Sequence, residues 1–197
     1  EFRRVLFRSV ASLTVNSGTI SGAGSINALG DITLNGGLVS STVNGVNLIV
    51  NADTTIAQAG SISGTTSINA GTLTLQQNNA LGAGELNLAS GATLAIGSTV
   101  QTVDGADIAG LITGSGTLAL GTGALALSGA NVAVNLTGSG AITADGSVTL
   151  SGANTLTGPT AVVTGTLTVS SNNSIGSGAL TVASGSTLAI GTTSQTV

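Results

Sequence analysis

Six acidic residues are the only charged side chains after position 9, so any acid–base or metal chemistry would depend on them. They are Asp31, Asp53, Glu85, Asp104, Asp107 and Asp145. Asp104 and Asp107 are close in sequence and could donate oxygens to Ca²⁺. This ion needs about six or more oxygen ligands, and the glycine–aspartate repeat of calcium-binding β-helices is absent. The spacing therefore favours an acidic turn between strands over a calcium site.

The residue types that are missing exclude most other chemistry. The sequence has no Cys and no His, which excludes disulfides, Cys/His zinc sites and Ser-His-Asp or Cys-His nucleophiles within it. After Arg8 no Lys or Arg remains to neutralise phosphate, which argues against nucleic-acid binding. Glycosidase chemistry needs two carboxylates at a fixed separation, and nothing in the sequence pairs distant acids. We therefore predict no enzymatic activity, no catalytic, cofactor-binding or metal-binding residue, no cofactor and no nucleic-acid partner.

The first nine residues differ in composition from the rest of the chain. They contain every basic and every aromatic residue of the sequence, namely Phe2, Arg3, Arg4, Phe7 and Arg8. Residues 4–9 read RVLFRS, which resembles the translation of a sequencing-library adapter. We predict that residues 1–9 are a sequencing or cloning scar and that the true termini lie outside the sequence. The alternative is a native, slightly basic N-terminal arm.

Residues 10–197 show short apolar pairs at alternating positions. Examples are Leu73/Leu75, Leu86/Leu88, Leu94/Ile96, Leu118/Leu120, Leu167/Val169, Leu180/Val182 and Leu188/Ile190. This spacing places both members of a pair on one face of a strand, and no window has helical spacing. Turn signals such as Asn35-Gly36-Gly37 and Asn44-Gly45 recur about every ten residues. The chain is predicted to be all-β.

One segment occurs twice: residues 71–103 return as residues 165–197, with about two-thirds of the positions identical and no gap. A period of about 94 residues fits four or five solenoid turns of about twenty residues. Inward Leu, Val and Ile without aromatic residues favour a narrow stacked core over a sandwich or barrel. We predict a right-handed parallel β-helix of roughly nine turns over residues 10–197. In Asn78-Asn79 and Asn172-Asn173, Asn is expected to take a left-handed conformation and to bond its own backbone.

The second copy resembles a known family. SGANTLTG at 151–158, GTL at 165–167, NNSIGSG at 172–178 and LAIG at 188–191 are similar to the passenger-associated repeat of bacterial autotransporters. The first copy matches from Gly71, with NNALGAG at 78–84, whereas residues 61–70 lack the SGAN opening. Leu156 stands where the family usually has an aromatic residue. The resemblance covers about half of residues 10–197.

The resemblance implies a β-helical passenger of a type V secreted protein at the bacterial cell surface, anchored in the outer membrane or secreted. It also implies a C-terminal outer-membrane β-barrel in the same full-length chain. We expect a non-enzymatic stalk that supports adhesion or self-association, with further copies or a host surface ligand as partners. Two alternatives remain: a direct adhesin whose Thr, Ser and Asn faces bind a ligand, and a carbohydrate-active β-helix enzyme.

Overall fold

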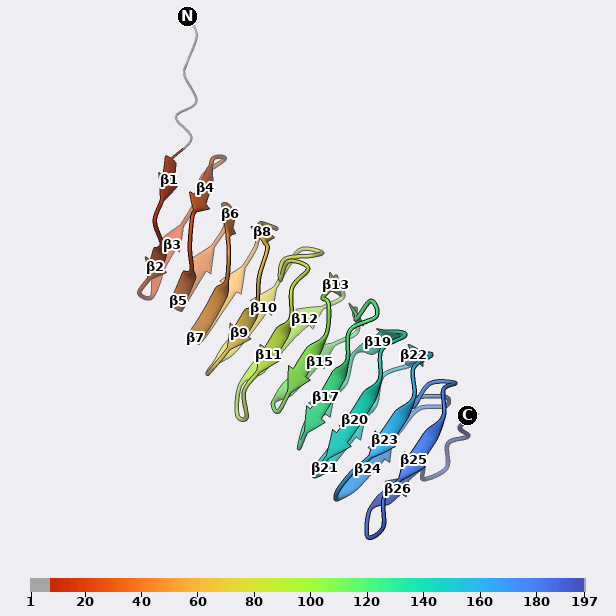
Figure 1. The fold of residues 1–197 in the computed structure, drawn as a ribbon. Coiled ribbons are helices and arrows are strands. Elements are labelled where there is room, and N and C mark those ends of the chain that lie inside the picture. Colours follow the sequence, from red (N-terminus) through yellow and green to blue (C-terminus); the bar gives the residue numbers. More distant parts are fainter. Residues whose placement is uncertain (1–7, 197) are drawn as a thin grey trace, which may run out of the picture.

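The computed structural model describes residues 8–196, which form 26 short strands and no helix. Figure 1 shows these strands stacked along one axis, from β1 at one end of a rod to β26 at the other. The prediction of an all-β chain folded as a parallel β-solenoid is confirmed. Most of the predicted scar, residues 1–7, lies outside the described residues. The first strand, β1 (Arg8–Val10), begins two residues before residue 10.

Each turn of the solenoid crosses three faces, and the strand pairings within residues 8–196 are parallel. The first face consists of β2 (Leu13–Val15), the first halves of β5 (Ile32–Val39) and β7 (Leu48–Ile56), β9 (Thr66–Ile68), β11 (Leu86–Leu88), β14 (Ala106–Ile108), β17 (Leu125–Ser128), β20 (Ile142–Asp145), β23 (Thr160–Val162) and β25 (Leu180–Val182). The second face consists of β3 (Gly18–Ile20), the second halves of β5 and β7, β10 (Thr72–Leu75), β12 (Thr93–Gly97), β15 (Leu111–Gly114), β18 (Asn131–Val132), β21 (Ser147–Leu150), β24 (Thr166–Val169) and β26 (Thr187–Ala189). Together these two faces form an 18-stranded sheet.

The third face is divided into two 4-stranded ladders. The first ladder contains β1, β4 (Ser25–Ala28), β6 (Thr42–Gly45) and β8 (Ser61–Ile62), and the second contains β13 (Val100–Thr102), β16 (Thr117–Ala119), β19 (Asn135–Gly138) and β22 (Thr155–Leu156). The ladders are separated because a turn at residues 76–84 replaces the strand between β8 and β13. The equivalent turn at residues 170–178 follows β22.

The solenoid has about 10 turns rather than the nine predicted. The prediction assumed about twenty residues in every turn. In the structure Thr66 pairs with Leu86, a turn of that length, but Ile32 pairs with Leu48, only 16 positions further on. Stacking at about 4.8 Å per turn gives a rod of roughly 45 Å.

In the shortest of these turns a strand runs through a corner of the solenoid. Asn35-Gly36-Gly37 is predicted to be a turn, but the prediction is wrong because β5 continues through it with a register shift after Leu34. Gly36 and Gly37 bend the strand with φ of 100° and 109°. A Cβ on Gly37 would lie 2.0 Å from the carbonyl oxygen of Gly18, so the adjacent turn admits only glycine there. The second predicted turn, Asn44-Gly45, likewise lies within strand β6.

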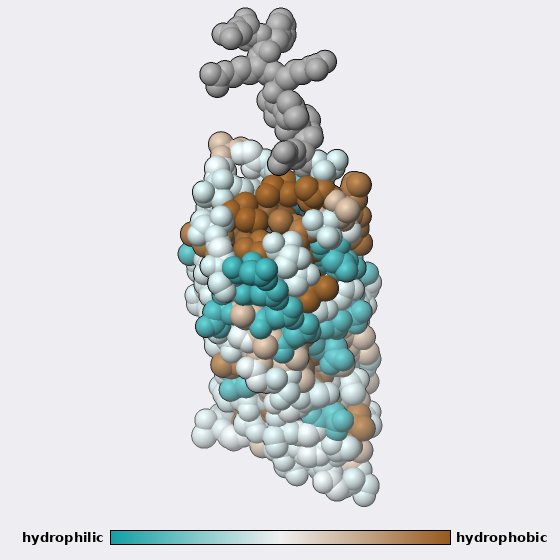
Figure 2. Space-filling model, turned by 90° about the vertical axis from the view of Figure 1, so that its left-hand side faces the viewer, coloured by the Kyte–Doolittle hydropathy of each residue, from teal (hydrophilic) through white to brown (hydrophobic). Residues whose placement is uncertain are grey.

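The core is a single column of aliphatic side chains inside the three faces. Leu73 stacks on Leu94, which stacks on Ile112, and all three are fully buried. The apolar pairs predicted to point inward do so, but the last turn leaves Val182 and Ile190 about two-fifths exposed because no described turn covers them. Val10 and Leu13 are partly buried at the opposite end, where Figure 2 shows a hydrophobic patch.

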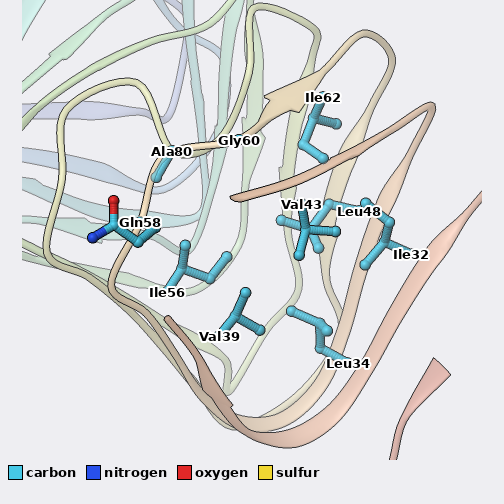
Figure 3. A pocket seen from close by; sticks show the side chains of 10 residues that line it. All are labelled: Ile32, Leu34, Val39, Val43, Leu48, Ile56, Gln58, Gly60, Ile62 and Ala80. Carbon is cyan, nitrogen blue, oxygen red and sulfur yellow. The ribbon is translucent and has the colours of Figure 1, made fainter. Parts of the chain in front are cut away.

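One internal cavity lies in the N-terminal half of this column, with a volume of ≈ 20 Å³. Figure 3 shows inward aliphatic side chains around it, among them Ile32, Val39, Leu48 and Ile56. A space of this size holds about one water molecule, and an apolar lining gives such a water few partners. The cavity is a small gap in the packing of the core.

A ladder of asparagines joins the first four turns at the corner between the first and second faces. Asn35 Nδ2 donates to Asn16 Oδ1 (2.8 Å), Asn51 Nδ2 to Asn35 Oδ1 (2.9 Å) and Asn69 Nδ2 to Asn51 Oδ1 (2.9 Å). Two of these bonds share Asn51. The ladder stops at Asn69, because alanines follow Leu88 and Ile108 at the same corner of the next two turns.

Asn51→Ala is expected to lower the free energy of unfolding by about 1 kcal/mol, because it removes two exposed amide–amide bonds whose partners can still bind water. Urea denaturation followed by circular dichroism measures the change. Asn131→Ala is the matched control, since Asn131 is exposed on the second face and has no side-chain hydrogen bond in the structure. Equal midpoints for both variants would show that the ladder adds no stability.

Candidate binding surfaces

Three of the six acidic residues that could have formed an active site act as hydrogen-bond acceptors between turns. Asp31 Oδ1 accepts from Asn47 Nδ2 (2.8 Å), and Asp53 Oδ1 accepts from the backbone N–H of Thr72 (2.8 Å). Asp145 Oδ1 accepts from the hydroxyl of Thr164. In each case the donor lies one turn further along the chain. These three carboxylates therefore stabilise the stacking of turns.

Asp104 and Asp107 occupy different kinds of position. Asp104 lies in the bend between β13 and β14, as the structural interpretation of this segment predicts. Asp107 does not belong to the turn: it lies within β14, exposed, with Asn87 and Ala126 as its neighbours in the adjacent turns. Among residues 8–196, no three Asp, Glu, His or Cys side chains form a group that could hold a metal ion.

The double-Asn turns are the most distinctive local structures of the chain. Asn79 and Asn173 have φ of 52° and 54°, which confirms the predicted left-handed conformation. The prediction that these turns are held by a bond from an Asn side chain to its own backbone is wrong. The first asparagine of each pair, Asn78 or Asn172, instead binds the backbone of the next turn of the solenoid. Asn78 Oδ1 accepts from the N–H of Val100 (2.9 Å), and Asn172 Oδ1 accepts from the N–H of Ser194 (2.9 Å).

A buried glutamine, which sequence analysis did not single out, completes each double-Asn turn. Gln101 is 0% exposed, and its Oε1 accepts from the N–H groups of Ala80 (2.8 Å) and Leu81 (3.4 Å). Its Nε2 donates to the carbonyl oxygen of Gln77 (2.8 Å) and to Thr99 Oγ1 (2.8 Å). The side chain thus satisfies backbone groups that a strand in this position would have satisfied by ladder pairing.

The second copy of the repeat reproduces this arrangement. Gln195 binds the N–H groups of Ser174 (2.7 Å) and Ile175 (3.4 Å), the carbonyl oxygen of Ser171 (2.8 Å) and Thr193 Oγ1 (3.1 Å). We call the double-Asn turn together with its glutamine the Asn–Gln lock. A buried threonine supports each lock from within the same turn. Thr66 Oγ1 donates to the carbonyl oxygen of Leu81, and Thr160 Oγ1 to that of Ile175, both at 2.8 Å.

Two surface hollows on the third face lie beside the two locks. The first hollow (≈ 520 Å³) is lined by Gly60, Ser61, Ile62, Ser63, Asn79, Gly82, Ala83 and Thr102. The second hollow (≈ 400 Å³) is lined by Asn154, Thr155, Leu156, Thr157, Asn173, Gly176, Ser177 and Thr196. Each residue of the first hollow has its counterpart in the second exactly one repeat further along the chain. The duplicated segment therefore builds the same surface feature twice.

No family model, curated protein or solved structure matches the chain significantly. The described residues also contain no helix that is long and apolar enough to cross a membrane. The fold and the two copies of the repeat are thus the observations on which a functional proposal can rest.

Proposed function

We propose that residues 10–197 are a non-enzymatic stalk segment of an autotransporter passenger, displayed at the bacterial surface or secreted, that supports adhesion or self-association. The observation that carries this proposal is the repeated Asn–Gln lock within a straight stack of parallel turns. It falls on the residues that resemble the passenger-associated repeat, NNALGAG at 78–84 and NNSIGSG at 172–178.

The surface chemistry supports a spacer. Most outward residues are small and uncharged, and Figure 2 shows a surface of mostly intermediate hydropathy on the side in view. Three of the six acids bind the neighbouring turn, which leaves them poorly suited to acid–base catalysis. A stack of similar turns extends a terminal domain away from a membrane without needing a large core.

The stalk proposal is tested by displaying residues 10–197 on non-aggregating cells through a heterologous anchor. Cells that carry the segment should stay dispersed, as do cells that carry the anchor alone, in a settling assay with equal display confirmed by antibody labelling. Clumping of the cells would favour the alternative, in which the segment is itself an adhesin. Reducing-end release from polysaccharide, lost on mutation of the acids, would favour the enzyme alternative.

The assignment to a passenger has a separate test at the native locus. We expect an export signal upstream and an outer-membrane β-barrel downstream in the same reading frame. A frame that leads to a different anchoring module would refute the autotransporter proposal and would leave the solenoid fold unaffected.

A further inference from the structure

The two hollows keep the same chemistry beyond the part of the repeat that is recognisable in the sequence. Residues 60–63 and 154–157 lie upstream of the 71–103 and 165–197 copies, where the sequence similarity is weak. The hydroxyls are nevertheless retained, because Ser61 corresponds to Thr155 and Ser63 to Thr157. Each hollow also contains one buried aliphatic side chain, which forms its floor: Ile62 in the first hollow and Leu156 in the second.

The lining is uncharged and rich in hydrogen-bonding groups. In the first hollow, Ser61, Ser63, Asn79 and Thr102 are exposed and present hydroxyl and amide groups around the aliphatic floor. The nearest charged residues in sequence are Glu85 and Asp104, each two positions from a lining residue. Both are acids, so an anionic ligand would be repelled at this hollow. The lining therefore suits a neutral ligand with many hydroxyls.

A continuous column of outward residues connects the two hollows along the third face. Thr102, which lines the first hollow, pairs with Ala119, which pairs with Thr137. Thr137 in turn pairs with Thr155, which lines the second hollow. The column is neutral and carries small side chains, so an extended molecule can lie along it between the hollows.

The distance between the hollows follows from the register. Five turns separate Thr66 and Thr160, the threonines that support the two locks, which corresponds to about 24 Å at about 4.8 Å per turn. The rise per turn is close to the length of one sugar in an extended glycan. A linear glycan of several sugars can therefore place hydroxyls in both hollows at once.

We propose that the two hollows and the column between them form a bivalent binding site for a neutral, linear glycan chain. The site binds without catalysis, and it is independent of whether the segment serves as a stalk. Occupying both hollows makes the second contact intramolecular, so a chain that spans them binds more tightly than one that reaches a single hollow.

The test measures binding of the purified chain to fluorescently labelled neutral oligosaccharides by polarisation. Trisaccharides and octasaccharides of β-1,4-glucan, α-1,4-glucan and β-1,4-mannan are compared, with octagalacturonate as the anionic counterpart. At least one neutral octasaccharide should bind about tenfold or more tightly than its trisaccharide, because only the longer chain reaches both hollows. The octagalacturonate should not bind.

Blocking substitutions locate the site. Ala83→Gln and Ser177→Gln each place a longer uncharged side chain in one hollow, and both positions are exposed. Either single variant should lower octasaccharide affinity to that of the trisaccharide, and the double variant should abolish binding. Ala133→Gln, at an exposed position after β18, is the control and should bind as the unaltered chain does.

Three results would overturn the proposal: no binding of any neutral octasaccharide, unchanged affinity in the double variant, or preference for the anionic chain. Binding of an extended Ser/Thr-rich peptide but of no glycan would also overturn it and would indicate a peptide site. Because the assay uses the isolated chain, these outcomes leave the display test of the stalk proposal unaffected.

Discussion

Ile108→Asp will disrupt the middle of the solenoid and lower the free energy of unfolding by more than about 4 kcal/mol. Ile108 is 0% exposed in β14 and stacks between Leu88 and Leu127. A carboxylate there would have no water and no polar partner. The adjacent Asp107 carries the same group on the same strand without this cost, because it is exposed. Urea denaturation by circular dichroism measures the loss, and limited proteolysis should show a new cleavage region near β14.

Leu188→Asp is the matched control for this prediction. Leu188 occupies an inward position in β26, but it is only partly buried because no described turn covers it. Its carboxylate can remain hydrated, so we expect a loss of about 1 kcal/mol or less. Equal losses for the two variants would contradict the view that burial in the stack, rather than the substitution itself, determines the effect.

Gln101→Leu is expected to cost about 2–5 kcal/mol, although leucine has a similar size and suits the aliphatic surroundings. The substitution leaves the buried N–H groups of Ala80 and Leu81 without their acceptor, and a buried polar group left unsatisfied costs about 1–3 kcal/mol. The thermal midpoint and the hydrogen-exchange rate of the Ala80 amide report the effect. We expect the amide to lose protection even under conditions where the rod remains folded.

The second copy supplies the comparison. Gln195 makes the same set of bonds, but it is only partly buried in the last turn, where water can replace the side chain. Gln195→Leu should therefore cost less than about 1 kcal/mol. If Gln101→Leu were as mild as Gln195→Leu, the lock would not contribute to stability through burial of its backbone groups.

The first and second faces were predictable from the sequence because each turn contributes two inward aliphatic residues at alternating positions. Leu73/Leu75 and Leu94/Ile96 show this pattern, and all four are buried as predicted. The period-2 signal is visible because many of these strands have a buried residue at both alternating positions, as β9 and β11 do. The unequal turn lengths were not predictable from this pattern: β5 continues through a corner, but Leu125 also pairs with Ile142, 17 positions further on, with β17 and β18 as separate strands.

The third face was largely missed because several of its strands lack a second inward aliphatic residue. Its strands contain two to four residues, and several have a single inward side chain, such as Val43 in β6 or Ile62 in β8. One apolar residue between polar neighbours has no periodicity. Asn44-Gly45 was therefore interpreted as a turn, although Asn44 donates to Asn27 within the ladder at 2.7 Å.

The candidate site was also only partly accessible from the sequence. The double-Asn turns were recognised, but the glutamine that holds each of them follows Asn78 or Asn172 by 23 residues. Its one signal was a glutamine kept at the same place in both copies, in VQTV and SQTV. The hollows depend on residues from three successive turns, so their lining becomes apparent only when the register is known.

Because the repeat spans a whole number of turns, its length has an evolutionary consequence. A recombination event that inserts or deletes one 94-residue unit joins ends that already match in register, so the solenoid is lengthened or shortened by five turns without a new junction. Each added unit would bring its own Asn–Gln lock and its own hollow on the same side of the rod. Variation in the number of units would then change the length of the rod and the number of hollows together while every turn keeps its neighbours.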